Sequence, residues 1–230
     1  MHIAVIPARS GSKGVANKNL LRFRGQSLIS KAANCARETG LFSQVILSTD
    51  SDVYAAEGIK SDCLVPFLRP ADLASDQANI ADVLIDLLQR QDPSQDWETL
   101  TLLEPTCPLR TSIMVSQCMR LCADDATVDA SLTLSRISRK YHSAKQFVRD
   151  ASGRVDFAHP EGGSVVNRQE LDDRYIRNGA AYTIRCSSLR NTGRLLQGVI
   201  RSLVIEDYLI NIDTPADIAD LRLHGEVGLV

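Results

Sequence analysis

The residues with the clearest chemistry lie in a glycine-rich turn near the N-terminus. A short apolar segment, 3–6, runs directly into 7–14, whose sequence is Pro-Ala-Arg-Ser-Gly-Ser-Lys-Gly. Glycines let backbone N–H groups approach an anion, and cationic side chains neutralise its charge. Three cations, Arg9, Lys13 and Lys18, fall within ten residues, which suits a triphosphate better than a neutral ligand. The alternative is a surface turn with solvated charges.

This turn differs from the two commonest nucleotide-binding loops. A Walker A loop has the order G-x-x-x-x-G-K-[ST], whereas here Lys13 precedes Gly14 and no Ser or Thr follows. A dinucleotide-binding fingerprint has the order G-x-G-x-x-G, and this turn has only Gly11 and Gly14. The sequence therefore indicates a phosphate site of another kind.

A second group of candidate residues lies near the C-terminus and is acidic. Segment 210–213, Ile-Asn-Ile-Asp, is predicted to be a strand. Thr214, Pro215 and Asp217 predict the start of a helix, with Thr as the N-cap and Pro at the first helical position. We therefore expect Asp213 at a strand end, facing the same ligand as the glycine-rich turn. A carboxylate opposite a triphosphate commonly holds Mg²⁺, whereas capping alone explains Asp217.

The elements that must position these residues alternate along the chain. Short apolar strands are predicted at 45–48, 100–103, 129–134, 179–185 and 203–205, and helices at 76–91, 112–122 and 218–223. This alternation predicts an α/β fold: a Rossmann-like, mostly parallel sheet with helices on both faces. Ligands of such sheets bind beyond the carboxyl ends of the strands, where the loops after Ile6, Ser48 and Leu103 are expected.

Segment 135–175 breaks the alternation. It is rich in Arg, Lys and Gly, and its apolar periodicity is weak. We predict a single domain over 1–230 from which 135–175 leaves as an inserted arm or hairpin. An arm that cannot bury itself often packs on a second copy, so we expect a homodimer. The alternative is a mobile surface insertion.

Composition excludes several classes of partner. The net charge of −2 provides no bulk electrostatic attraction to nucleic acid or to an anionic membrane, and no run of 18 apolar residues predicts a transmembrane helix. The N-terminus lacks the pattern of a secretory signal. The six cysteines form no C-x-x-C pair and no zinc-ligand spacing, so we expect small buried thiols in a reducing compartment. Together these features predict a cytoplasmic protein.

Six motifs in order resemble those of the acylneuraminate (CMP-sialic acid) cytidylyltransferases, also called CMP-sialic acid synthetases. The motifs are 6–14 with Lys18-Asn19, 48–51, 68–76, 103–110, 168–169 with 178–182, and 211–214. Each motif alone is weak, but six in the right order are specific. The resemblance implies a nucleotide-diphospho-sugar transferase type of fold. It also implies that CTP and a nonulosonic acid are joined into a CMP-sugar with release of pyrophosphate, with Mg²⁺ as cofactor.

The resemblance also implies a role for each matched position. The catalytic residues implied are Arg9, Lys13, Lys18 and Asp213. The nucleotide-binding residues implied are Ala8, Arg9, Ser12, Lys13, Asn19, Arg69 and Ala78. The sugar-binding residues implied are Glu104, Lys145, Arg168, Asn178 and Tyr182, with Lys145 reaching across the dimer. The metal ligands implied are Asp213 and Asn211. For Lys145 and Arg168 the alternative is a solvated face of the arm.

Three positions depart from the family pattern. Asn211 replaces an Asp, which keeps an oxygen ligand but removes a negative charge. Glu104 replaces a Gln and adds a negative charge, which disfavours an acidic sugar unless a cation or a proton compensates. Cys107 replaces a Ser, a mild change. These departures leave the sugar open, so legionaminic and pseudaminic acids remain alternatives.

Two rival functions remain beside this one. The KDO cytidylyltransferases have a similar reaction, but their opening resembles A-R-x-x-S-x-R-L-P, and Ser12-Lys13-Gly14 argues against it. The other rival is a catalytically inactive nucleotide-binding relative, for which Asn211 is the best support.

Overall fold

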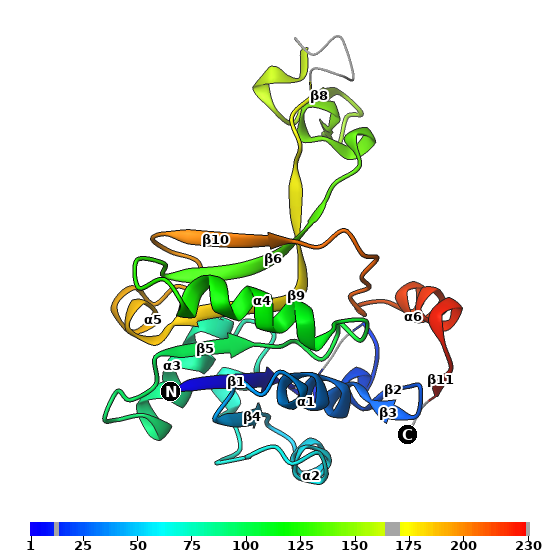
Figure 1. The fold of residues 1–230 in the computed structure, drawn as a ribbon. Coiled ribbons are helices and arrows are strands. Elements are labelled where there is room, and N and C mark those ends of the chain that lie inside the picture. The colour runs from blue at the N-terminus through cyan, green and yellow to red at the C-terminus, as the bar shows by residue number, and fades with distance from the viewer. Residues whose placement is uncertain (12–13, 164–170, 229–230) are drawn as a thin grey trace.

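The structure, a computed structural model, describes residues 1–11, 14–163 and 171–228. Its centre is a six-stranded sheet in the order β10-β6-β9-β5-β1-β4 (Figure 1). The strands are β1 (His2–Pro7), β4 (Gln44–Ser48), β5 (Thr99–Leu102), β6 (Ala130–Arg136), β9 (Tyr175–Arg185) and β10 (Ile200–Val204). β1 is parallel to β4 and β5, and β10 is parallel to β6, whereas β9 is antiparallel to both of its neighbours. The predicted mostly parallel α/β sheet is confirmed.

Helices cover both faces of this sheet, and β1 shows how its residues divide between them. Ala4 and Ile6 pack in one buried cluster with α1 (Leu28–Glu38), α2 (Asp52–Lys60) and α4 (Ser112–Ala123). Ile3 and Val5 pack in the other cluster with α3 (Ile80–Gln91) and α5 (Cys186–Thr192). Successive side chains of a strand point to opposite faces, so a strand covered on both sides is apolar throughout.

The start of α3 corrects one prediction. The helical pattern from 76 suggested a helix from that residue, but Ala71–Ala74 forms a short 3-10 helix and α3 begins only at Ile80. The Asn79 side chain caps α3 by accepting a hydrogen bond from the Ala81 N–H at 3.0 Å. Asn at an N-cap satisfies a free N–H of the first turn. Asp76 is consequently in a loop rather than on a helix.

The segment before the last α-helix corrects a second prediction. Residues 210–213 form no strand; instead the Ile212 N–H donates one hydrogen bond to the Thr106 carbonyl at 2.9 Å. Ile210 and Ile212 are buried in a third cluster with Phe23 of β2 (Arg22–Phe23). The alternation of apolar and polar residues in 210–213 therefore reflects burial of the two isoleucines and not hydrogen bonding in a sheet.

The predicted helix start at Thr214 is confirmed. α6 spans Pro215–Leu221, whereas a helix over 218–223 was predicted, and Thr214 and Asp217 form a reciprocal capping box. A 3-10 turn, Arg222–His224, follows it. The chain then pairs β11 (Val227–Gly228) with β2, and β2 with β3 (Gln26–Ser27), in a small antiparallel sheet.

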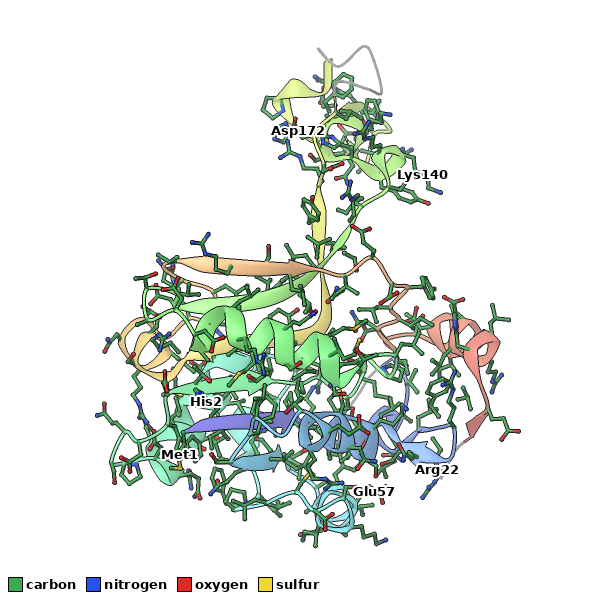
Figure 2. All side chains as sticks on the ribbon, viewed as in Figure 1. Met1, His2, Arg22, Glu57, Lys140 and Asp172 are labelled. Carbon is green, nitrogen blue, oxygen red and sulfur yellow. The ribbon has the colours of Figure 1, made fainter. Side chains whose placement is uncertain are left out.

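Residues 137–163 and 171–174 stand away from the sheet as an arm (Figure 1). The arm contains the antiparallel hairpin of β7 (Phe147–Arg149) and β8 (Val155–Phe157). The Phe147 and Phe157 rings have centroids 4.6 Å apart, yet both side chains are exposed. Figure 2 shows Lys140 and Asp172 on this arm, remote from the sheet. Dimerisation through the arm stays a prediction.

Two further sequence predictions concern thiols and membranes. All six cysteines are buried and free, as expected. Burial raises the pKa of the Cys35 thiol to about 11, so this thiol stays protonated and unreactive at neutral pH. Within the described residues, no helix combines the length and apolarity that crossing a membrane requires.

Candidate nucleotide site

A cavity of about 500 Å³ opens beside the carboxyl ends of β1, β4 and β5. Its walls come from the loops after β1 and β5, from segment 69–78 with the first turn of α3, and from the segment before α6. Eight residues proposed from sequence line it: Arg9, Lys18, Asn19, Arg69, Ala78, Glu104, Asn211 and Asp213. This is the edge at which open α/β sheets bind ligands.

The glycine-rich turn and the acidic segment meet in this cavity. Lys18 Nζ lies 2.9 Å from Asp213 Oδ1 and donates to the Ile212 carbonyl at 3.2 Å. A Cβ on Gly14 would lie 2.0 Å from the Asp213 carbonyl oxygen, so only glycine permits this approach. The Asp213 side chain is 70% exposed, which leaves its carboxylate open to a ligand. Residues far apart in sequence thus form one charged wall.

Two aspartates that received no role from the sequence hold the turn in place. Asp50, just after β4, accepts hydrogen bonds from the Ser10 N–H and hydroxyl, each at 2.8 Å. Asp76 Oδ1 lies 2.6 Å from Arg9 Nη1 across the cavity. Both belong to motifs of the family resemblance, S-T-D-S and L-A-S-D, which was the available signal.

Arg69 is a buried residue that ties its loop to the end of β4. Its buried guanidinium donates to the Ser48 carbonyl at 2.8 Å and to the Ser48 hydroxyl at 3.2 and 3.3 Å. Burial lowers the pKa of Arg69, and the nearby Asp50 carboxylate opposes this shift. Because arginine starts from so high a pKa, the group stays charged at neutral pH. Arg69 therefore fixes the loop that carries Ala78 to the end of β4.

Glu104 follows β5 and is partly buried at the cavity floor. Burial raises the pKa of its carboxyl group, and Arg110 is the largest influence that opposes the rise, with Lys18 and Arg177 acting in the same direction as Arg110. Among the described residues its carboxylate forms no hydrogen bond, whereas its carbonyl accepts from Arg110 Nη2. Three cations thus oppose the effect of burial on Glu104, whereas the nearby Asp213 carboxylate adds to it.

Asn211 lies near Glu104, and its side-chain oxygen Oδ1 is buried. Its Nδ2 donates to the Asn178 carbonyl at 3.0 Å, but its buried Oδ1 has no hydrogen-bond partner among the described residues. A Cβ on Gly179, whose φ is +71°, would lie 2.6 Å from that Oδ1 and 3.1 Å from Glu104 Oε2. Glycine is therefore required here for both space and conformation. In the described ranges no cluster of three or more His, Cys, Asp or Glu suggests a metal site.

The remaining predicted residues lie elsewhere. Ala8 is fully buried, does not line this cavity and donates from its N–H to the Ser48 carbonyl at 2.9 Å. The buried Asn178 side chain is held by the Thr133 hydroxyl at 2.6 Å and the Ser135 hydroxyl at 3.1 Å. Lys145 is exposed on the arm. Ser12, Lys13 and Arg168 lie outside the described residues.

Tyr182 lines a second cavity of about 320 Å³. Ile80 and Glu104 line both cavities, so the two spaces meet beside the end of β5. Arg177 and Arg194 also line the second cavity, and the sequence motifs did not indicate either of them. Burial raises the pKa of the Tyr182 hydroxyl, which keeps it protonated and able to donate.

The chain is similar in sequence to known cytidylyltransferases. Residues 3–95 match the family described as cytidylyltransferase. The N-acylneuraminate cytidylyltransferase of Streptococcus agalactiae serotype V is 29% identical over 225 residues, covering 96% of this chain and 52% of that protein. The CMP-N,N'-diacetyllegionaminic acid synthase of Legionella pneumophila is 27% identical, covering 94% of this chain and 92% of that protein. The resemblance predicted from the motifs is confirmed.

A solved structure supports the fold. The structure of CMP:2-keto-3-deoxy-manno-octonic acid synthetase complexed with CTP has a TM-score of 0.74 at 17% identity, covering 97% of both chains. The fold is thus that of nucleotidyltransferases, as predicted. The chain spans about half the length of the streptococcal relatives that it matches.

Proposed function

We propose that this chain is a cytidylyltransferase that joins CTP to a nonulosonic acid and releases pyrophosphate. The observation that carries the proposal is the contact between the glycine-rich turn and the acidic segment. Lys18 and Asp213 are 2.9 Å apart in a cavity at the carboxyl end of the sheet. The chain's similarity to enzymes named for this type of reaction supports the same conclusion.

The roles of the residues follow from their charges and positions. Arg9 and Lys18 neutralise the triphosphate, and Asn19 orients the turn by donating to the Arg9 carbonyl at 3.2 Å. The loop from Arg69 to Ala78 frames the cytosine. The anomeric hydroxyl oxygen of the sugar acid attacks the α-phosphorus in line and loses its proton to solvent, and the bond to the bridging oxygen breaks as pyrophosphate leaves. Such reactions need positioning and charge neutralisation more than covalent catalysis.

A divalent metal fits the oxygens of the acidic segment. Cytidylyltransferases of this kind generally use such an ion, and we propose Mg²⁺ with Asp213 and Asn211 as its protein ligands. The exposed Asp213 carboxylate and the unpartnered Asn211 Oδ1 are hard oxygen donors of the type that Mg²⁺ prefers. When bound, the ion would neutralise charge on the phosphates.

A homodimer is part of the same proposal. The β7–β8 hairpin exposes Phe147, Val148, Val155 and Phe157, and a second copy is the partner that would cover them. Lys145 lines neither cavity described above, and the arm carries it away from the sheet. We therefore assign Lys145, together with Arg168, to the sugar site of the partner subunit. Buried free thiols support a cytoplasmic location.

One observation favours a second acceptor. The Legionella relative named for diacetyllegionaminic acid is 27% identical over 94% of this chain, close to the 29% identity over 96% of the streptococcal relative. A legionaminic-type acid is therefore the second candidate beside a sialic acid.

The decisive experiment is pyrophosphate release from CTP and Mg²⁺ with a panel of N-acetylneuraminic, legionaminic, pseudaminic and KDO acids. We expect release with at least one of the nonulosonic acids, and none when ATP replaces CTP. Binding of CTP without turnover on any acid of the panel would instead identify a catalytically inactive relative.

A further inference from the structure

Two of the three departures from the family pattern meet in space. Glu104 follows β5 and Asn211 precedes α6, and both side chains line the nucleotide cavity. A Cβ on Gly179 would lie 2.6 Å from Asn211 Oδ1 and 3.1 Å from Glu104 Oε2, so the two oxygens face the same backbone position. Where the family has an uncharged Gln and an Asp, this chain has Glu104 and Asn211. The pair therefore keeps one negative charge but carries it on the other member.

Neither of these oxygens is satisfied by the part of the protein that the structure describes. The Glu104 side chain is partly buried, yet its carboxylate accepts no hydrogen bond and forms no ion pair with a described residue. The buried Oδ1 of Asn211 likewise has no hydrogen-bond partner there. Proteins pair buried charges with cations or use them to coordinate metals, and a buried oxygen without a protein partner is usually bound by an ion or a water. Two such oxygens at one position indicate a cation.

The protein's own cations near Glu104 do not take this place. Lys18 Nζ lies 2.9 Å from Asp213 Oδ1, and Arg110 Nη2 donates to the Glu104 carbonyl rather than to its carboxylate. Arg177 acts on the Glu104 carboxyl group without forming an ion pair with it. Burial is the largest cause that raises the pKa of Glu104, and the Asp213 carboxylate raises it further. Two carboxylates that repel each other in one cavity are stabilised by a shared cation.

The contacts of Asn211 explain why the charge is on the other member of the pair. Its Nδ2 donates to the Asn178 carbonyl of β9 at 3.0 Å. A carboxylate at position 211 could not donate this hydrogen bond, because an ionised carboxylate only accepts. The amide therefore keeps one contact with β9 and leaves only its neutral Oδ1 for an ion. Mg²⁺ is bound mainly by carboxylates and phosphates, so this arrangement needs a negative charge from a neighbour.

We propose that Glu104 supplies the negative charge that Asn211 lacks and is, with Asp213 and Asn211, a protein ligand of the divalent cation. This inference rests on the proposed function, which assigns Mg²⁺ to the same cavity. Mg²⁺ sites commonly combine one or two carboxylates with phosphate oxygens and water, so Glu104 and Asp213 complete such a set without a third acidic residue. Glu104 is then a metal ligand and not the sugar contact that its motif implied.

The first test measures Mn²⁺ binding from the electron paramagnetic resonance signal of the free ion, with the chain and CTP at equal concentrations and no sugar acid. Glu104→Gln should weaken the Kd for Mn²⁺ about tenfold, because metal sites lose at least this much when a supporting group is removed. Glu38→Gln is the matched control, since it removes the same charge from an exposed position on α1 that lines neither cavity. Its Kd should equal that of the wild type. An unchanged Kd in Glu104→Gln would overturn the assignment.

The second test moves the charge back. The double variant Glu104→Gln with Asn211→Asp should recover most of the Mn²⁺ affinity that Glu104→Gln loses. It should also melt below Glu104→Gln, because a carboxylate at position 211 cannot donate to the Asn178 carbonyl. A double variant that is folded by circular dichroism and binds Mn²⁺ no better than Glu104→Gln would contradict exchange of the charge between the two positions. If the double variant does not fold, the single variant decides alone.

Turnover separates a metal ligand from a sugar contact. At low Mg²⁺ concentration, Glu104→Gln should release pyrophosphate about tenfold more slowly than the wild type, and saturating Mg²⁺ should restore most of the rate by mass action. A KM for the sugar acid that stays raised at saturating Mg²⁺ would place Glu104 in the sugar site instead. A wild-type chain that releases no pyrophosphate with any acid would remove the proposed function, whereas the Mn²⁺ titrations with CTP would still decide the role of Glu104.

Discussion

At the carboxyl end of the sheet, distant segments meet through short contacts between charged groups, whereas in the arm large apolar side chains face solvent. Lys18 and Asp213 are 2.9 Å apart there, and Gly14 packs directly on the Asp213 backbone. On the arm, Phe147 and Phe157 contact each other but remain exposed. A single chain thus brings the charged groups of the candidate site together, whereas it leaves these apolar side chains of the arm exposed. A second copy that covers them is part of our proposal.

Among the substitutions considered, Asp213→Ala should have the largest effect on activity. Loss of the Asp213 carboxylate from the cavity should reduce kcat by about a hundredfold or more, as expected for removal of a group that stabilises transition-state charge. Asp207→Ala, at an exposed position before α6 that lines neither cavity, is the control. Pyrophosphate release measures both, and circular dichroism checks the fold. Near wild-type turnover would exclude Asp213 as the metal ligand.

Lys145→Ala tests the other half of the comparison. If the arm acts on the partner subunit, this variant should lose about tenfold in kcat/KM for the sugar acid but keep its affinity for CTP. Mixed with Asp213→Ala, it should recover about a quarter of wild-type activity, because half of the dimers are mixed and each has one complete site. Verified mixed dimers that show no recovery would contradict action in trans.

Gly14→Ala should have a smaller effect, confined to the nucleotide site. Its Cβ would lie 2.0 Å from the Asp213 carbonyl oxygen, so the turn or the acidic segment must move. A shift of this size should raise KM for CTP about fivefold to tenfold through misplaced contacts. Gly228→Ala, whose Cβ would meet nothing within 4 Å, is the matched control. Equal KM values in the two variants would show that this close approach is not needed.

Glu104→Gln should have the smallest effect when no metal is present, and its sign depends on pH. Burial raises the folded-state pKa of Glu104, so the folded state holds the proton more tightly than the unfolded state. Ionising Glu104 therefore costs stability as the pH rises from its ordinary pKa through the raised value. The variant without the charge should melt about 2–4 °C above wild type at pH 8, with a smaller difference at pH 5. Thermal scans without metal or nucleotide measure this, and a larger gain at pH 5 would contradict the shift.

Much of the sheet was predictable because local patterns match the final environment. The apolar run 3–6 is buried on both faces, and Thr214 caps α6 as its spacing with Asp217 indicated. Prediction failed at 210–213, where alternating isoleucines suggested a strand. Ile210 and Ile212 are buried against β2 without a ladder, and period-two burial does not distinguish the two cases.

Some residues of the candidate site could likewise be proposed from the sequence, whereas others could not. Lys18 and Asp213 could be proposed from residue types and motif order, because phosphates and metals demand cations and oxygens. Asp76 received no role because the helix was predicted to begin at this residue. Arg177 and Arg194 received no role because neither belongs to one of the six motifs. Arg177 belongs to β9 and Arg194 to the loop after α5, and the fold brings both segments to one cavity.

Residue types and their order were enough to predict the kind of chemistry, from a strand followed by a cationic glycine turn and from a carboxylate before a capped helix. These are local properties, since caps, turns and strand periodicity depend on neighbours in the chain. Only the tertiary structure decided which charges oppose each other, which oxygen is left without a partner and where the second cavity opens. Those features depend on contacts between segments up to 195 residues apart, which no local pattern encodes.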